Sequence, residues 1–451
     1  MRITRRQFSA ASLAAMTQTR PAVAASRPNI VVILADDLGY ADLGFQGCRD
    51  IQTPHLNSLA GSGVRFTSGY VSHPFCSPTR AGLMTGRYQQ RFGHENNMKF
   101  KLNDEVAGLP LSEATLPSVL SNAGYVTGLV GKWHLGVHPR FHPLKRGFRE
   151  MFGFLGGGHD YFHPGAEGED RELFLPILRN TAVVAEKEYL TTALGREAAA
   201  FVRRHQRTPF FLYLSFNAPH TPLQAPDTYV NRFARIGNKD RRVYAAMVSA
   251  MDDAIGQVLG ALRQAQLEEE TLIFFLSDNG GPTGNASDNR PLRGTKRTLY
   301  DGGIRVPFVI RWPGRLPKGK TIRDPIISLD IFPTALAAAG VAAPGGNKLD
   351  GVNLLPLLEG RSAPAQRRQL FWRTFGGVHF AAREGALKLV RNADAPPELY
   401  DVERDAGETK NLAASRPDEL RRLQAAMDAW NQDLATPLWP DHIFHREAIG
   451  Q

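Results

Sequence analysis

The sequence is poor in cysteine: among 451 residues it has only Cys48 and Cys76. Two cysteines cannot build the disulfide framework of a small secreted scaffold, and nothing around them predicts that they pair. The fold must therefore rest on an ordinary apolar core. A chain of this length is long enough for one large domain and a smaller one.

The sequence also lacks long apolar runs, runs of like charge, internal repeats and low-complexity segments. No segment after the N-terminus is long and apolar enough to cross a bilayer, so we expect no stable membrane insertion. The formal net charge is +10, but four arginines lie before Ser26 and the remaining excess is spread along the chain. This dispersed charge predicts no nucleic-acid partner and suits attraction of an anionic substrate.

Residues 1–25 have the parts of an export signal in the expected order. A basic stretch containing Arg5 and Arg6 precedes a short apolar stretch at 8–16 and small residues at 22–25. The sub-pattern Thr-Arg-Arg-Gln-Phe is similar to a twin-arginine signal, which predicts bacterial export of a folded protein to the periplasm or the medium. The alternative interpretation is a basic, disordered N-terminus.

Short, nearly continuous apolar runs recur through the first three quarters of the chain. They lie at 29–35, 125–130, 209–216, 271–277 and 306–312. Such runs are typical of parallel strands covered by helices on both faces. Helical patterns lie between them, for example at 115–124 and 241–262, and the alternation predicts a doubly wound α/β domain over residues 26–360.

The pattern changes after residue 360. A linker-like stretch at 361–369 is followed by four short strand-like segments and by a helical pattern that begins at Pro417. We expect residues 361–451 to form a small α+β domain, with an antiparallel sheet and one helix.

Acidic and amide side chains follow two of the predicted strands. Asp36 and Asp37 come after the first run, and Asp278 and Asn279 come after the fourth. Ligands bind at the carboxyl ends of parallel strands, and oxygen donors of this kind suit Ca²⁺ or Mg²⁺. The alternative is that each Asp only caps a turn, but the presence of two such pairs favours a metal site.

A set of basic side chains lies in strand-end or glycine-flanked loops. Together they offer the donors that a tetrahedral anion needs, and an acid and a base for group transfer. Any one of them alone is more often a surface or packing residue. The set comprises Arg80, Lys132, His134, His220 and Lys296.

Cys76 stands at the predicted start of a short helix. Pro78 fits the first helical turn, and the helix is expected to run to Thr85 before Gly86 ends it. Free N–H groups at a helix N-terminus favour an anion and would also stabilise a thiolate. The alternatives at this point are a reactive thiol and a buried, inert one.

These pieces together resemble the sulfatase family of the alkaline-phosphatase-like superfamily. Cys-Ser-Pro-Thr-Arg-Ala-Gly-Leu-Met-Thr-Gly-Arg at 76–87 matches the family's first signature, and 124–136 matches its second. Further family segments occur in order at 35–39, 217–222, 277–281, 292–307 and 398–413. The likeness spans 28–432 and includes arylsulfatase and N-acetylgalactosamine-6-sulfatase-like members. Thr79 departs from it, since the family more often has Ser there.

The resemblance implies a large mixed, mostly parallel sheet sandwiched by helices, with a small C-terminal antiparallel-sheet domain. It also implies that a formylglycine-generating enzyme oxidises Cys76 to formylglycine, whose aldehyde hydrates to a geminal diol. The diol would lie beside a Ca²⁺, with Mg²⁺ the less favoured ion. The implied metal ligands are Asp36, Asp37, the modified Cys76, Asp278 and Asn279.

The resemblance assigns roles to the basic set. Arg80 and Lys132 would support the hydrate, one oxygen of which attacks sulfur. His220 and Lys296 would bind the sulfate and help to protonate the leaving oxygen. His134 would then take a proton, so that sulfate is eliminated and the aldehyde reforms.

The implied activity is hydrolysis of sulfate esters, of a sulfated carbohydrate first and of a small aryl sulfate second. The enzymatic alternative is a phosphoester or phosphonate monoester hydrolase of the same superfamily, and the non-enzymatic one is an inactive binding protein. Three loops, at 94–104, 153–164 and 373–380, are expected to shape the pocket. Within them, His159, Asp160, Tyr161 and His379 are either sugar contacts or scaffolding.

Overall fold

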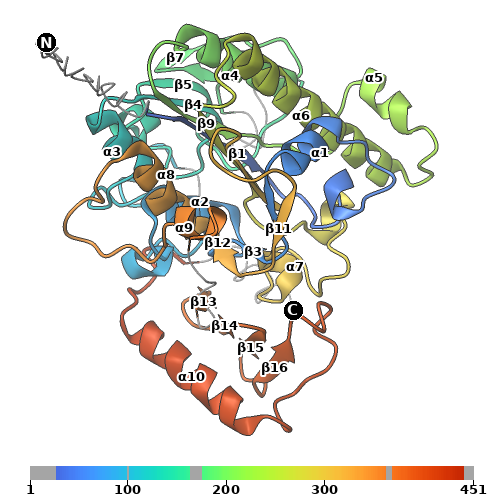
Figure 1. The fold of residues 1–451 in the computed structure, drawn as a ribbon, viewed down its shortest axis with the longest axis vertical. Helices are drawn as coiled ribbons and strands as arrows, with labels where there is room; N and C mark the ends of the chain where they lie inside the picture. The colour runs from blue at the N-terminus through green and yellow to red at the C-terminus, as the bar shows by residue number, and fades with distance from the viewer. Residues whose placement is uncertain (1–26, 99–100, 163–174, 362–367, 441–451) are drawn as a thin grey trace, which may run out of the picture.

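The computed structural model describes residues 27–98, 101–162, 175–361 and 368–440 (Figure 1). The predicted export signal at 1–25 lies outside these residues. The main sheet contains β1 (Asn29–Ala35), β2 (Val64–Phe66), β4 (Val126–Lys132), β5 (Glu150–Phe154), β6 (Leu178–Arg179), β7 (Ala182–Val183), β8 (Phe210–Ser215), β9 (Thr271–Ser277), β10 (Phe308–Arg311) and β11 (Lys320–Ile322). Its strand order is β11-β2-β10-β9-β1-β8-β4-β5-β6-β7.

The centre of this sheet is parallel. Strands β9, β1, β8, β4 and β5 run in one direction, so the residues that follow them emerge at the same edge. All seven residues of β1 and all seven of β9 are buried, because helices cover both faces. The expected mixed, mostly parallel sheet is confirmed.

The direction of one strand differs from the prediction. Strand β10, in the run at 306–312, is antiparallel to β9 and β2. A strand buried on both faces reads as a continuous apolar run whichever way it points, so the pattern could not distinguish the two directions.

Helices form a layer on each side of the main sheet (Figure 1). One face is covered by α1 (Pro54–Gly61), α4 (Leu190–Arg204) and α6 (Lys239–Gln264), and the other by α2 (Cys76–Thr85), α3 (Leu116–Asn122) and α8 (Ile331–Ala339). Shorter elements complete the chain: α5 (Asp227–Val230), α7 (Asp301–Ile304), α9 (Leu355–Leu358), and the paired strands β3 (Gly69–Tyr70) and β12 (Ile326–Ile327). In the described parts of the chain, no helix is both long and apolar enough to span a membrane.

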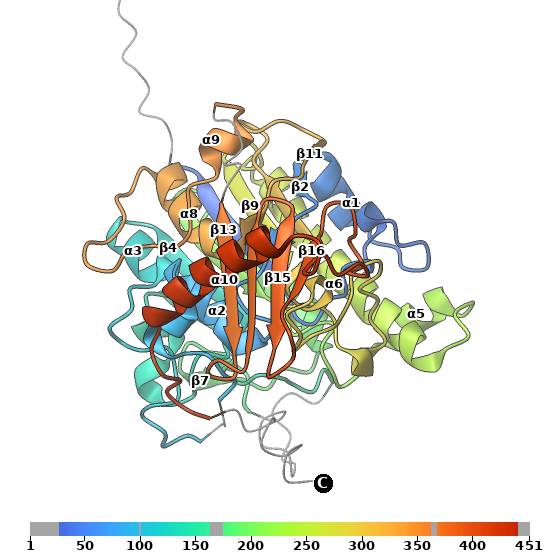
Figure 2. The same cartoon turned by 90° about the horizontal axis from the view of Figure 1, so that it is seen from below.

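The C-terminal part is an antiparallel sheet with a helix across it (Figure 2). The sheet contains β13 (Gln369–Thr374), β14 (His379–Glu384), β15 (Leu387–Asn392) and β16 (Glu398–Asp401), and α10 (Pro417–Gln432) packs on its outer face. Its inner face joins the main core: Trp372 packs against Tyr70 and donates a hydrogen bond from Nε1 to the Val71 carbonyl at 2.7 Å. The inner face of the small sheet therefore shares one hydrophobic cluster with the main sheet.

Candidate active site

Several of the residues predicted for the site follow or end four adjacent strands of the main sheet, β9, β1, β8 and β4. Asp36 and Asp37 follow β1, Asp278 and Asn279 follow β9, and Lys132 is the last residue of β4. His220 lies five residues after β8. The parallel directions of these strands bring all of these side chains to one edge of the sheet, as the strand-end rule predicts.

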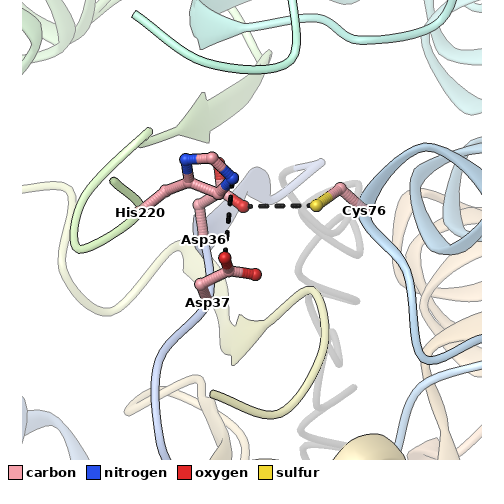
Figure 3. Close-up of side chains that lie close together, drawn as sticks. All are labelled: Asp36, Asp37, Cys76 and His220. Atoms are coloured by element: carbon pink, nitrogen blue, oxygen red, sulfur yellow. Dashed lines mark hydrogen bonds and ion pairs between the residues drawn. The ribbon is translucent and has the colours of Figure 1, made fainter. Parts of the chain in front are cut away.

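Cys76 lies at the start of α2 and faces the two aspartates of β1 (Figure 3). Only 1% of the Cys76 residue is exposed to solvent. The thiol Sγ lies 3.6 Å from Asp36 Oδ1 and 3.2 Å from the Lys296 Nζ. Burial raises the pKa of the Cys76 thiol well above its ordinary value, although Lys132 and Lys296 oppose the shift. An unmodified Cys76 is thus a neutral thiol and not the stabilised thiolate that a helix start permits.

The start of α2 tolerates threonine at position 79. Thr79 is buried, and its hydroxyl donates a hydrogen bond to the His73 carbonyl at 2.7 Å. A serine hydroxyl at this position has the same donor. The departure from the first signature therefore preserves the donor that this bond requires.

The acidic side chains form a compact oxygen-rich group. Asp36, Asp37, Cys76 and His220 each offer a ligand atom within 4.8 Å of the others. Asp37 has a φ of 64°, in the left-handed region, and its N–H donates to Asp278 Oδ1 at 3.3 Å. Asn279 donates from Nδ2 to Asp37 Oδ1 at 2.6 Å. Among the described residues, the buried Asn279 Oδ1 has no hydrogen-bond partner.

The environments of two of these carboxyl groups push their pKa values apart. Burial alone would raise the pKa of Asp36, but Lys132, His220 and Arg80 together hold it well below its ordinary value. Burial, together with the neighbouring charge of Asp36, raises the pKa of Asp278 to about 6. Carboxylates this close stabilise a positive charge placed between them.

Cationic side chains pair with each carboxylate of this group. The Arg80 guanidinium donates from Nε and Nη2 to Asp278 Oδ2 at 3.0 and 2.7 Å, and Lys132 Nζ lies 2.5 Å from Asp36 Oδ2. Lys296 Nζ is 2.6 Å from one oxygen of Asp37 and 2.8 Å from the other. Three carboxylates thus face three cations, and a divalent metal ion would leave a net positive charge for an anionic ligand.

The two histidines occupy different positions. His220 is the more accessible, with 22% of its side chain exposed, and its Nε2 lies 3.5 Å from Asp37 Oδ2 (Figure 3). His134 is buried at a φ of 57°, and burial, followed by the charges of Lys132 and Arg80, lowers its pKa well below the ordinary value. A neutral His134 can accept a proton.

The structure adds polar residues that the sequence did not single out. Ser215 Oγ accepts a hydrogen bond from Arg80 Nη1 at 2.5 Å, and Asn285 donates to the Asp37 carbonyl at 3.1 Å. Ser77, next to Cys76, donates to the His134 carbonyl at 2.7 Å. Ser215 ends β8, so the strand-end rule could have found it. Asn285 ends a short 3-10 helix (Thr283–Asn285) and has no such signal.

Three of the four residues considered as sugar contacts, His159, Asp160 and Tyr161, are placed as support, whereas His379 begins β14. His159 and Tyr161 are fully buried. Tyr161 donates its hydroxyl to the carbonyls of Asn217 and His220, both at 2.7 Å, and both ring nitrogens of His159 face backbone carbonyls. Asp160 accepts from Gln224 at 2.8 Å. These contacts favour the scaffolding interpretation, in which the loop supports the backbone of His220.

Cys48 lies apart from this group. Its thiol donates to Asp50 Oδ1 at 3.0 Å, and burial raises its pKa to about 12. Both cysteines are free. The absence of a disulfide between Cys48 and Cys76 agrees with the prediction.

Comparisons with known proteins show the family. The family model "Sulfatase" matches residues 28–341, and the model "N-sulphoglucosamine sulphohydrolase, C-terminal" matches 294–433. The chain is 36% identical to the N-acetylgalactosamine-6-sulfatase of Canis lupus familiaris, over 78% of this chain and 69% of the relative. It is 34% identical to human arylsulfatase A, over 89% and 88%.

A solved structure shares the whole architecture. The crystal structure of Ps i-CgsB in complex with k-i-k-neocarrahexaose superposes with a TM-score of 0.88, at 38% identity, and the match covers 93% of this chain and 96% of that one. The predicted family likeness is confirmed, both in sequence and in fold.

Proposed function

This chain belongs to the sulfatase family, and on that premise we propose that it hydrolyses the sulfate ester of a sulfated carbohydrate, using a formylglycine made from Cys76 and a bound Ca²⁺. The observation that carries the proposal is the group of paired acids and cations around a buried residue 76. It combines an oxygen-only donor set with several converging cations, which is what binding and transfer of a sulfuryl group require.

The donor set fits a hard divalent cation. Asp36, Asp37, Asp278 and Asn279 supply carboxylate and amide oxygens, and Asn279 Oδ1 is a buried acceptor without a partner among the described residues. Such an atom is expected where a ligand completes its coordination. A bound Ca²⁺ would supply positive charge next to the sulfate oxygens. Ca²⁺ suits these ligands better than Mg²⁺, because it tolerates irregular geometry.

The state of residue 76 favours modification over thiol chemistry. The thiol is buried and its pKa is raised, so it is a poor nucleophile near neutral pH. We infer that a formylglycine-generating enzyme converts it before the chain folds, since the folded chain hides it. Hydrated formylglycine supplies two hydroxyl groups on one carbon, one to attack sulfur and one to permit later release of sulfate.

The chain's own residues would act as follows. Lys296 and His220 hold the sulfate and the leaving oxygen, because Lys296 Nζ lies beside residue 76 and His220 is the accessible histidine. Arg80 pairs with Asp278, and Lys132 pairs with Asp36. These two cations hold the carboxylates in place and keep positive charge close to the nucleophile. A neutral His134 accepts the proton when sulfate is expelled.

The substrate class is proposed from the relatives. One is named an N-acetylgalactosamine-6-sulfatase, and a solved one was crystallised with k-i-k-neocarrahexaose. A sulfated carbohydrate is therefore proposed ahead of a small aryl sulfate. The signal-like residues 1–25 support export to the periplasm or the medium. We propose that a catalytic domain at 26–360 and a small domain at 361–451 follow them.

The test is a desulfation screen with the protein co-expressed with a formylglycine-generating enzyme. Sulfated oligosaccharides that differ in sugar and linkage are compared with matched aryl sulfate and aryl phosphate esters, and released sulfate and phosphate are measured by ion chromatography. Sulfate release from an oligosaccharide supports the proposal. Faster release of phosphate than of sulfate from the matched esters would favour the phosphoester hydrolase instead.

A further inference from the structure

Lys296 is presented by a closed loop, residues 293–303, which follows β9 in the chain and ends within α7. The ends of the loop meet, because Gly302 donates its N–H to the Arg293 carbonyl at 2.7 Å. Two further bonds tie it to the site: Gly280, next to Asn279, donates to the Gly303 carbonyl at 3.0 Å, and Arg297 donates its N–H to the Pro74 carbonyl at 3.1 Å. The loop therefore fixes where Lys296 lies relative to residue 76.

The C-terminal sheet holds the first end of this loop. Arg293 donates from Nη1 to the Tyr400 hydroxyl at 2.9 Å and to the Glu408 carbonyl at 3.1 Å. Its guanidinium also lies 3.8 Å from the centre of the Tyr300 ring. Tyr300 in turn donates its hydroxyl to Glu398 at 2.7 Å. Each of these partners outside the loop comes from β16 or from the segment that follows it.

A buried ion cluster, made of Asp301, Lys388 and Glu408, holds the second end. Lys388 Nζ bridges Asp301 Oδ1 at 2.7 Å and Glu408 Oε1 at 2.9 Å. The other oxygen of Glu408 accepts the Asp301 N–H at 2.8 Å, and Asp301 Oδ2 accepts the Tyr70 hydroxyl at 2.9 Å. All three charged side chains are fully buried. The cluster is thus a bond between the C-terminal sheet and the end of the Lys296 loop.

Glu408 makes this bond from a strained backbone. Its φ is 52°, in the left-handed region that non-glycine residues rarely adopt, at a cost of about 1 kcal/mol or more. Burial raises the pKa of its carboxyl to about 7, although Lys388 opposes the shift. A non-glycine residue stays in this backbone region only where its surroundings hold it there, and the contacts that hold Glu408 are those to Asp301 and Lys388.

We propose that Glu408 and Lys388 are positioning residues for Lys296: through Asp301 and the 293–303 loop, the C-terminal sheet fixes the lysine that faces the substrate sulfate. Neither residue touches residue 76 or the acids of the site. The inference deepens the proposed function and rests on the role given there to Lys296.

The kinetic test is a double-mutant cycle between Glu408 and Lys296, made with the fully modified enzyme. Glu408→Gln keeps the side-chain shape and is expected to lower kcat about 10-fold or more, because small displacements of a catalytic group are costly. In a Lys296→Ala background, the same change is expected to cause no further loss. The matched control is Glu419→Gln. Glu419 is a residue of α10 that pairs with Arg416, and loss of its charge should leave kcat unchanged.

Tyr300→Phe is a second variant, in case the buried substitution prevents folding. It removes the hydroxyl that bonds the same loop to Glu398, without changing a buried charge. It should lower kcat by a smaller factor than Glu408→Gln, and it should cause no further loss in the Lys296→Ala background. Equal fold-losses in the two backgrounds would overturn the proposal, because a general loss of stability does not depend on Lys296. A folded Glu408→Gln enzyme with normal kcat would overturn it as well.

A chemical readout separates this inference from the proposed function. The side chain of Lys296 is 13% exposed and paired with Asp37, so an amine-reactive reagent should label it slowly in the unaltered protein. Mass spectrometry should show labelling several-fold faster in Glu408→Gln and Tyr300→Phe, and unchanged in Glu419→Gln. Equal labelling rates would contradict the positioning role even if no sulfate ester were cleaved, and faster labelling without sulfatase activity would contradict only the proposed function.

Discussion

Two of the buried groups of paired charges in the described part of the chain differ in how completely their polar atoms are satisfied. In the ion cluster of Asp301, Lys388 and Glu408, every carboxylate oxygen has a hydrogen-bond partner. At the ends of β1 and β9, the Asn279 Oδ1 lacks one among the described residues, and His220 is partly open to solvent. Similar charges therefore serve two purposes. The closed cluster joins the C-terminal sheet to the 293–303 loop, whereas the open group at the strand ends has donors that would suit a metal ion and an anion.

Removing the nucleophile should have the largest effect. Cys76→Ala is expected to lower kcat/KM on any sulfate ester by about 10³-fold or more, because the proposed mechanism forms the covalent link to sulfur at residue 76. Cys48→Ala is the matched control, since the Cys48 thiol forms its hydrogen bonds with Asp50 and Arg241, outside the site, and it should retain normal activity. Substantial turnover by the Cys76 variant would contradict the assignment of the open group as the active site.

Emptying or damaging the metal position should come next. Chelation with EDTA, and separately Asp278→Ala, are each expected to lower kcat by about 10²-fold or more, with recovery on addition of Ca²⁺ only after chelation. Asp253 lies on α6 and pairs with Arg232. Asp253→Asn is therefore a control whose kcat, with and without EDTA, should match that of the unaltered enzyme. Full activity after exhaustive chelation would contradict a catalytic role for a metal ion.

A substitution in the closed cluster should lower the free energy of unfolding and not only kcat. Lys388→Met leaves two buried carboxyl groups without their shared cation, so the free energy of unfolding should fall by about 3–5 kcal/mol. Arg421→Met, which breaks an exposed pair with Asp418, should change it by about 1 kcal/mol at most. Thermal unfolding of both variants measures the difference. Equal, small changes would mean that the cluster is not the strong connection described above.

The pH dependence of stability gives a smaller and more specific effect. The pKa of Glu408 is raised from 4.5 to about 7, so the folded chain keeps a proton there that the unfolded chain releases. Its contribution to stability is present below pH 4.5 and is lost as the pH rises to about 7, by about 3 kcal/mol at most. Glu408→Gln cannot titrate, so its melting temperature should rise relative to the unaltered protein between pH 4.5 and 7. Parallel melting curves across that range would contradict the shift.

The sequence predicted the open group far better than the closed one. Asp36, Asp37, Asp278 and Asn279 follow apolar runs, and parallel strands must bring such residues to one edge. No comparable rule exists for Glu408, which lies in an irregular segment and looks like an ordinary surface acid. Its burial depends on how the C-terminal sheet packs against the 293–303 loop, and that packing is not encoded in any local pattern.

Two other features show the same limit. The direction of β10 could not be read, because its run is as apolar as the parallel strands beside it. The sequence left His159 and Tyr161 open as sugar contacts, but only the fold shows that their polar atoms are used by nearby carbonyls. Local periodicity reports whether a segment is buried, whereas partners distant in sequence decide what each polar group does.

The most direct test of the central claim is sulfate release by the enzyme after the chemical state of residue 76 has been determined. Peptide mass spectrometry quantifies formylglycine at position 76 in preparations made with and without the modifying enzyme, and ion chromatography measures sulfate released from a sulfated oligosaccharide. The proposed function predicts that activity rises in proportion to the formylglycine fraction and is absent from a preparation with only the thiol. Full activity in that thiol preparation would contradict it.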